Sequence, residues 1–217
     1  MPQPRVKICC IADSQEAADA IRFGASAIGL VGTMPSGPGP ISDEEILSIA
    51  NTVPPPIATF LLTSEQTAKG VIAHHQRTQT STIQVVDELT DRAYDEIRVA
   101  LPHVKLVQVI HVVGEASVRE AAEIAAHVDA ILLDSGNPSL PVKELGGTGR
   151  RHDWTLSRKI VETCGKPVFL AGGLNAENVR EAIDTVQPFG LDLCSGVRTD
   201  GSLDRKKLAA FFEAMQS

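Results

Sequence analysis

The chain has 217 residues, of which 43% are hydrophobic and 22% charged, enough for the core and the surface of one domain. Its net charge of -7 leaves it without the basic surface that nucleic acids and anionic membranes attract, so we expect neither as a partner. A small phosphorylated ligand remains compatible with this charge, because backbone amides can hold a phosphate group.

The N-terminal segment, residues 1–7, is short and polar, which is not the pattern of a secretory signal. No apolar stretch reaches the roughly 18 residues that a membrane helix needs. The four cysteines, in a chain of this length, are too few for a disulfide scaffold. We therefore expect the protein to be located in the reducing cytoplasm. No spacing of His, Cys and Asp resembles a metal site, so no metal is expected.

Strand-like and helix-like segments alternate along the chain. Eight short runs rich in β-branched residues are typical of strands: 6–10, 27–31, 57–62, 82–86, 105–112, 130–134, 167–171 and 191–195. Segments of helical periodicity follow them in turn: 14–23, 42–52, 64–76, 90–100, 115–127, 153–164, 175–186 and 203–215. Eight such repeats predict an α/β fold, with one domain (residues 1–217) forming a single (β/α)8 TIM barrel.

Several predicted helices begin with residues that cap a helix N-terminus. The expected N-cap positions are Asp13 or Ser14, Ser42, Ser64 with Thr67 three residues on, and Asn175 with Asn178. Ser42 with Glu45 has the spacing of a capping box. After the second strand, residues 32–40 are too rich in glycine and proline for regular structure, and this loop is either a lid or a spacer.

In a barrel of this kind the active site lies where the strands end, so glycine-bearing loops there are informative. Each glycine alone is explained by a tight turn. Together, on neighbouring strands, they favour a phosphate site, because glycine lets backbone N–H groups approach a ligand. A short helix after Gly196 would add its dipole. The predicted phosphate-binding residues are Gly147, Thr148, Gly149, Gly172, Gly173, Ser195 and Gly196.

The first strand carries a candidate base. Alternation places Lys7 and Cys9 inside the barrel and directs Ile8 and Cys10 toward the helices. Cys9 is nearest the mouth, where a thiolate could act as a base. The alternative for a single cysteine is a small buried hydrophobic residue, which these residues alone favour and which suits Cys10 well.

Three other polar residues lie in or at the ends of predicted strands. Asp134 ends an apolar run, where a carboxylate either caps the next loop or acts on a ligand, and both readings fit equally. Asp192 also faces inward, and an ion pair with Lys7 is slightly favoured over a role in binding. His111 could reach the site, although such a residue more often belongs to the hydrogen-bonded framework.

Six groups of residues, spread over the chain, form a further pattern. They are Lys7-Ile8-Cys9; Ala27-Ile28-Gly29; Leu132-Leu133-Asp134-Ser135; Gly146-Gly147-Thr148-Gly149 with Asp153-Trp154; Leu170-Ala171-Gly172-Gly173-Leu174-Asn175 with Asn178-Val179; and Ser195-Gly196-Val197. In residues, order and spacing this pattern resembles phosphoribosylanthranilate isomerase, a barrel enzyme of tryptophan biosynthesis.

The resemblance implies that Cys9 is the general base and Asp134 the general acid of an Amadori rearrangement, an aldose–ketose isomerisation. Asp134 would protonate the ribose ring oxygen, the ring would open to a Schiff base, and Cys9 would remove the C2 proton. The partner implied is a small phosphorylated substrate, and no cofactor is needed. A monomer and a homodimer are both compatible with the chain.

The sequence departs from the family where the aromatic carboxylate should bind. Residues 35–40 lack the arginine of the family's Ser-Pro-Arg element, and Gln84-Val85-Val86-Asp87 lacks the histidine of the fourth strand. Cys10 replaces a glycine, and Arg198 replaces a glutamate. A lost bidentate arginine costs a few kcal/mol of carboxylate binding. The weaker candidates for substrate contact are Lys7, Asp192 and Arg198.

Three functions are compatible with these features. The first is the isomerisation of phosphoribosylanthranilate. The second is an isomerase of the same fold for another phosphorylated sugar or aminosugar, which the missing arginine and histidine keep open. The third is a barrel that binds a phosphorylated ligand without turnover. Because both Cys9 and Asp134 are present, we favour the first modestly over the second, and both over the third.

Overall fold

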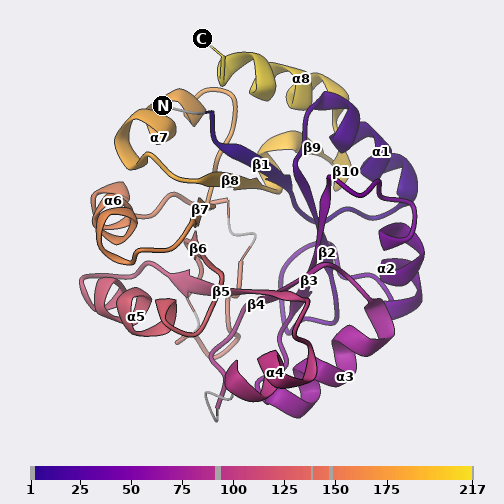
Figure 1. The fold of residues 1–217 in the computed structure, drawn as a ribbon. Helices are drawn as coiled ribbons and strands as arrows, with labels where there is room; N and C mark the ends of the chain where they lie inside the picture. The colour runs from indigo at the N-terminus through magenta and orange to yellow at the C-terminus, as the bar shows by residue number, and fades with distance from the viewer. Residues whose placement is uncertain (1–2, 91–93, 138, 147–148, 217) are drawn as a thin grey trace.

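The structure, a computed structural model, describes residues 3–90, 94–137, 139–146 and 149–216. Within them, eight parallel strands close into a barrel in chain order, with β1 paired to β8, and helices surround it (Figure 1). The prediction of a (β/α)8 barrel is confirmed. The barrel strands are β1 (Arg5–Ile8), β2 (Ala27–Val31), β3 (Ala58–Thr63), β4 (Thr82–Val85), β5 (Lys105–His111), β6 (Ala130–Asp134), β7 (Val168–Leu170) and β8 (Gly190–Leu193).

The helices follow the predicted segments closely. They are α1 (Ser14–Phe23), α2 (Asp43–Ala50), α3 (Ala68–Thr78), α4 (Tyr94–Ala100), α5 (Ala116–Ala125), α6 (Trp154–Thr163), α7 (Val179–Val186) and α8 (Arg205–Ala214). A 3-10 turn, η1 (Ser195–Val197), and a small antiparallel pair, β9 (Arg198–Thr199) and β10 (Ser202–Leu203), lie between β8 and α8. The short helix expected after Gly196 is therefore this single turn, which begins at Ser195 and includes Gly196.

Two of the four predicted caps stand as expected. Asp13 accepts from Glu16, and Ser42 with Glu45 forms the complete capping box of α2. The prediction for Ser64 is wrong, because α3 begins later and Thr67 caps it. Asn175 does not cap α7 directly; its side chain closes the turn before that helix.

The alternation of side chains along the strands divides the core into two apolar layers. The larger layer lies between the strands and the helices and includes Ile28, Leu61 and Ile83. The smaller fills the barrel, where Phe60 meets Phe169 edge to face at a centroid distance of 5.9 Å. This packing holds the strand ends rigidly, so side chains placed there keep fixed positions.

The end of the first strand differs from the prediction. β1 ends at Ile8, and Cys10 adopts a left-handed backbone conformation with φ of 60°. The left-handed residue breaks the alternation of a strand, so the Cys10 side chain joins the inner layer instead of facing the helices. The prediction of its direction was therefore wrong, whereas that of its burial was confirmed.

No helix in the described ranges has both the length and the apolar character needed to cross a membrane.

Candidate active site

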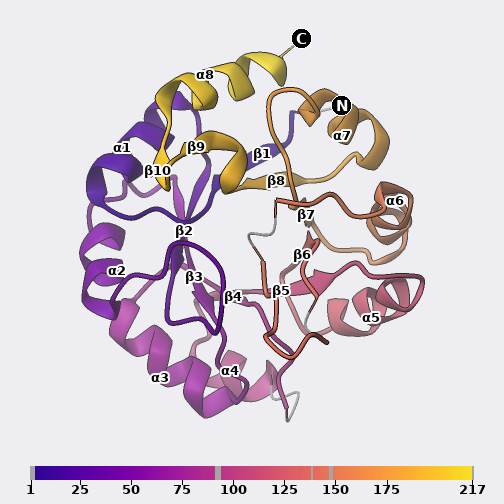
Figure 2. The ribbon, with the colours of Figure 1, turned by 180° about the vertical axis from the view of Figure 1, so that it is seen from behind.

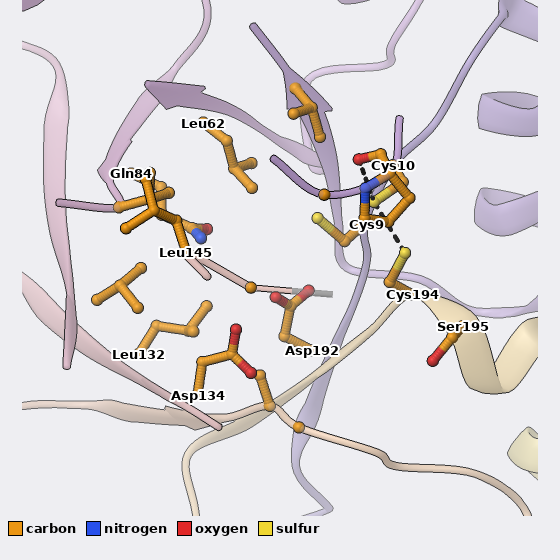
Figure 3. A pocket seen from close by; sticks show the side chains of 18 of the residues that line it. Cys9, Cys10, Leu62, Gln84, Leu132, Asp134, Leu145, Asp192, Cys194 and Ser195 are labelled. Atoms are coloured by element: carbon orange, nitrogen blue, oxygen red, sulfur yellow. Dashed lines mark hydrogen bonds between the residues drawn. The ribbon is translucent and has the colours of Figure 1, made fainter. Parts of the chain in front are cut away.

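A pocket opens at the end of the barrel where the parallel strands finish (Figure 3). It contains about 740 Å³ of empty space, counting the part open to solvent. It brings together polar residues that are far apart in the sequence, including Cys9, Asp134, Asp192 and Ser195. Val109, Leu132 and other aliphatic residues also line it. Such a site combines apolar walls with a few fixed polar groups, as small-molecule sites do.

Cys9 follows β1 and lines the pocket, with only 5% of its surface exposed. Its sulfur lies over Gly29 of β2, where a Cβ would approach Sγ to 2.9 Å. The same missing Cβ would lie 3.0 Å from Nζ of Lys7, so the thiol and the ammonium group occupy the space that this glycine leaves. The predicted inward direction of both side chains is confirmed.

Beneath the pocket, Lys7 is completely buried and its Nζ lies 2.8 Å from Oδ1 of Asp192. The favoured interpretation of Asp192, an ion pair with Lys7, is confirmed, and Asp192 also lines the pocket. Burial alone would lower the pKa of Lys7, but the charge and hydrogen bond of Asp192, together with the Cys9 and Cys10 sulfurs, outweigh it and raise that pKa. The Lys7 ammonium is therefore held by the barrel, which corrects the expectation that Lys7 contacts substrate.

Asp134 ends β6 and points into the pocket from the side opposite Cys9, with Asp192 between them (Figure 3). Its Oδ1 accepts a hydrogen bond from the Ser135 N–H at 2.7 Å. Burial raises the pKa of Asp134, with this hydrogen bond acting in the opposite direction. A carboxyl group that retains its proton can serve as a general acid.

The loop after β6 covers Asp134. A Cβ on Gly146 would lie 2.8 Å from its Oδ2, so only glycine lets the backbone come this close. Gly146 has φ of 147°, a conformation that favours glycine as well.

The three glycine loops converge on one wall of the pocket, formed by Gly149, Gly172, Gly173 and Ser195. The first three have positive φ, and a Cβ on Gly173 would lie 2.7 Å from the Gly149 carbonyl oxygen, so the loops after β6 and β7 pack directly on each other. Successive backbone groups in such turns form concave anion sites.

Three predicted phosphate residues need separate mention. Gly196 is not among the residues that line the pocket. The Leu174 carbonyl oxygen leaves no room for a Cβ at this position, so the glycine lets the loops after β7 and β8 pack together. Its predicted contact with a phosphate group stays a prediction. Gly147 and Thr148 lie outside the described residues.

Arg198 lies behind the pocket wall. It pairs with Glu16 of α1 at 2.9 Å, and its guanidinium donates to the carbonyl oxygens of Cys9, Cys10 and Gly201. These bonds hold the turn that carries Cys9, and they correct the expectation that Arg198 contacts substrate. The partner Glu16 carries no signal in the sequence, because 182 residues separate the two side chains.

The loop of residues 32–40 forms part of the pocket wall through Met34, Ser36, Gly37 and Pro38. It lies at the end of the barrel seen in Figure 2, and the Ser36 hydroxyl donates to the Lys143 carbonyl oxygen at 2.5 Å. The loop is thus more than a spacer, because it bridges the mouth to the segment after β6. The sequence did not identify this contact.

Gln84 of β4 is another residue that the sequence reasoning did not select. Its residue surface is 3% exposed, it lines the pocket, and its buried Oε1 has no hydrogen-bond partner among the described residues. An unpaired buried oxygen is costly, so it is suited to a ligand that donates a hydrogen bond. The feature of the sequence that could have identified Gln84 is its position next to the end of the fourth strand. His111 instead approaches the Val86 carbonyl oxygen at 3.1 Å and belongs to the framework.

The described pocket wall contains no lysine or arginine, and its acidic residues are Asp134 and Asp192. No group of three His, Cys, Asp or Glu residues in the described ranges is arranged to hold a metal ion.

This geometry agrees with comparisons to known proteins. The model of the N-(5'phosphoribosyl)anthranilate (PRA) isomerase family matches residues 6–214. The chain belongs to this family. An N-(5'-phosphoribosyl)anthranilate isomerase 2 of Methanosarcina mazei is 34% identical, with 95% of this chain and 92% of that protein covered. The N-(5'-phosphoribosyl)anthranilate isomerase of Haloarcula marismortui is 33% identical, with 91% of this chain and 88% of that protein covered.

Solved structures of the family have the same fold. The phosphoribosyl anthranilate isomerase of Thermococcus kodakaraensis has a TM-score of 0.82 at 28% identity, covering 98% of this chain and 99% of that one. A family structure in complex with reduced 1-(o-carboxyphenylamino)-1-deoxyribulose 5-phosphate has a TM-score of 0.77 at 25% identity and covers 98% of each chain.

Proposed function

We propose that the chain isomerises N-(5'-phosphoribosyl)anthranilate to the corresponding aminoketose in tryptophan biosynthesis, with Cys9 as general base and Asp134 as general acid. The observation that carries this assignment of roles is the placement of the two side chains on opposite sides of one pocket. The glycine loops along its wall support phosphate binding by Gly149, Gly172, Gly173 and Ser195.

The chemistry requires one acid and one base on different sides of a sugar. Asp134 protonates the ribose ring oxygen, which opens the ring to a Schiff base at C1. The Cys9 thiolate removes the C2 proton, and the enolamine that forms tautomerises to the aminoketose. Each group contributes about 10²–10⁴-fold to the rate. These steps need no cofactor.

The acid role is supported by the raised pKa of Asp134, because its burial favours the protonated form. The base role is supported by the buried Lys7 ammonium group next to Cys9, because a nearby cation stabilises negative charge on the sulfur. Lys7 and Asp192 are thus positioning residues beneath the reacting groups.

A second candidate is the isomerisation of another phosphorylated sugar or aminosugar. The observation that favours it is the absence of lysine and arginine from the described pocket wall, where the anthranilate carboxylate has to be held. On our primary proposal, the neutral donors of the loop 32–40, such as backbone N–H groups, take over this contact. We also propose that the enzyme acts in the cytoplasm as a monomer or homodimer, without a nucleic-acid or membrane partner.

The decisive experiment follows anthranilate fluorescence while phosphoribosylanthranilate is generated in the assay. We expect turnover by the wild type and a loss of about 10²-fold or more in Cys9→Ser and Asp134→Asn. Cys164→Ser is the matched control, because Cys164 lies at the end of α6, away from the pocket. A folded wild type that binds inorganic phosphate without turning this substrate over would contradict the proposal. Turnover of another phosphorylated aminosugar would then establish the second candidate.

A further inference from the structure

Two cysteines that the proposed chemistry does not use lie in contact at the pocket wall. Cys10 follows β1 and Cys194 follows β8, and their sulfur atoms share a hydrogen bond with an Sγ–Sγ distance of 2.8 Å (Figure 3). All four cysteines of the chain are free thiols in this structure. Because 184 residues separate the two positions, the barrel alone brings them together.

The two thiols have different surroundings. Cys194 is half-buried and lines the pocket, so a small reagent in the pocket can reach its sulfur, whereas the other three cysteines are buried. The shared hydrogen bond lowers the pKa of Cys194, and the nearby Arg198 guanidinium lowers it further. The same hydrogen bond raises the pKa of Cys10. Cys194 is thus the thiol of the pair that loses its proton more readily.

Cys10 is held in place against Cys194 from the other side. Its Sγ approaches the Pro38 carbonyl oxygen at 3.6 Å, and a Cβ on Gly39 would lie 2.6 Å from its Cβ. Cys9 is also within hydrogen-bonding reach of Cys10, but it affects the pKa of Cys10 less than Cys194 does, and its sulfur lies over Gly29. Cys164 instead contacts the Lys166 carbonyl oxygen at 3.6 Å. A disulfide bond is about 2.05 Å long, so closing the pair requires a small movement.

We propose that Cys10 and Cys194 form a modification site, a redox pair that a hydroperoxide converts to a reversible disulfide. The Cys194 thiolate attacks the terminal oxygen of the hydroperoxide; the S–O bond forms, the O–O bond breaks, and an alcohol or water leaves with a proton. The Cys10 sulfur then attacks the sulfenic acid at Cys194; the S–S bond forms, and water leaves with the Cys10 proton.

Overall, the two thiols lose two protons and two electrons, and the hydroperoxide is reduced to an alcohol, or to water, plus one further water. The bond joins the turn that carries Cys9 to the residue before Ser195. A thiol reductant reverses it.

The test uses purified full-length protein that has been reduced, freed of reductant and treated with hydrogen peroxide. We expect the thiols that react with a thiol reagent in denaturant to fall from four to two. The intact mass should fall by two hydrogen atoms, and peptide mapping should link position 10 to position 194. Dithiothreitol should restore all four thiols. None of these readouts depends on isomerase activity.

Variants define the pair. Cys164→Ser should still form the bond, with three thiols falling to one, whereas Cys10→Ser and Cys194→Ser should form no internal disulfide. Circular dichroism checks that each variant is folded, and mapping of the wild type decides the question if either is not. Four thiols that remain free, a disulfide that includes Cys9, or sulfinic acid at Cys194 without a cross-link would each overturn the proposal.

Discussion

Nζ of Lys7 and Oδ1 of Asp192 lie 2.8 Å apart inside the barrel, in a pair that joins β1 to β8 directly beneath the pocket. Lys7 has no exposed surface, and its Nζ also lies 5.3 Å from the centre of the Phe60 ring. A buried charge that loses its partner is strongly destabilising, whereas removal of both charges is often tolerated.

We therefore expect Asp192→Asn to lower the free energy of unfolding by about 3–5 kcal/mol, since the Lys7 ammonium stays buried without a counter-charge. The double variant Lys7→Met/Asp192→Asn should recover most of this loss. Denaturant unfolding of the wild type, Lys7→Met, Asp192→Asn and the double variant measures both the loss and the recovery. If Asp192→Asn were as stable as the wild type, the pair could not be holding the interior charge.

Asp134 should make stability depend on pH in the opposite direction from an ordinary carboxylate. Its pKa is raised by burial, so its contribution to stability is present below the ordinary pKa of an aspartate and is lost as pH rises through the raised value. Asp134→Asn should therefore be more stable than the wild type at pH 8, with the difference narrowing toward pH 4. Parallel urea titrations at the two pH values test this, and a constant difference would contradict it.

Gly39 and Cys10 should be energetically coupled. Alanine at position 39 should be destabilising for two reasons. The backbone there has a φ of +83°, and the alanine Cβ would lie 2.6 Å from the Cβ of Cys10. The left-handed backbone alone costs about 1–2 kcal/mol. In a Cys10→Gly background the contacts with the Cβ and Sγ of Cys10 disappear and only that with the Cα, at 3.1 Å, remains, so Gly39→Ala should cost about 1 kcal/mol less than in the wild type. Strict additivity of the two substitutions would show that the contact carries no energy.

His152 should weaken the fold in acid. It lies behind the phosphate wall, with Nε2 2.7 Å from the Ser157 hydroxyl, and burial lowers its pKa from 6.5 to about 4. Above pH 6.5 neither folded nor unfolded chain binds this proton. As the pH falls from 6.5 to 4, the unfolded chain binds a proton at this histidine before the folded chain does. The free energy of unfolding therefore decreases by about 3 kcal/mol over this range.

His152→Gln should remove this pH dependence, as measured by the free energy of unfolding at pH 7 and pH 4.5. The matched control is His103→Gln, because His103 lies in an exposed turn. An unchanged slope in His152→Gln, relative to the wild type, would rule out His152 as its source.

The barrel could be predicted from the sequence because it depends on local patterns, whereas the catalytic roles of Cys9 and Asp134 were predicted from the family resemblance. Short runs rich in β-branched residues, separated by helical segments, predict parallel strands whose ends meet at one face. Cys9 and Asp134 occupy such ends, so the topology places them at the same mouth. The glycine loops after β6, β7 and β8 were found in the same way.

Other features depend on contacts between distant segments. The direction of Cys10 was predicted wrongly because a residue with positive φ does not follow strand alternation, and Gly39 and Cys194 hold that turn from elsewhere in the chain. The partner of Arg198 could not be found either, since any exposed carboxylate of the sequence was an equal candidate.

The sequence by itself thus determined the repeat, the family pattern and the strand ends that carry Cys9 and Asp134, since these depend on residues close together in the chain. Only the tertiary structure decided that residues 32–40 reach Lys143, that Lys7 is neutralised by Asp192, and that Cys10 contacts Cys194. The physical reason is barrel closure: it sets the distances between loops, and no local pattern contains those distances.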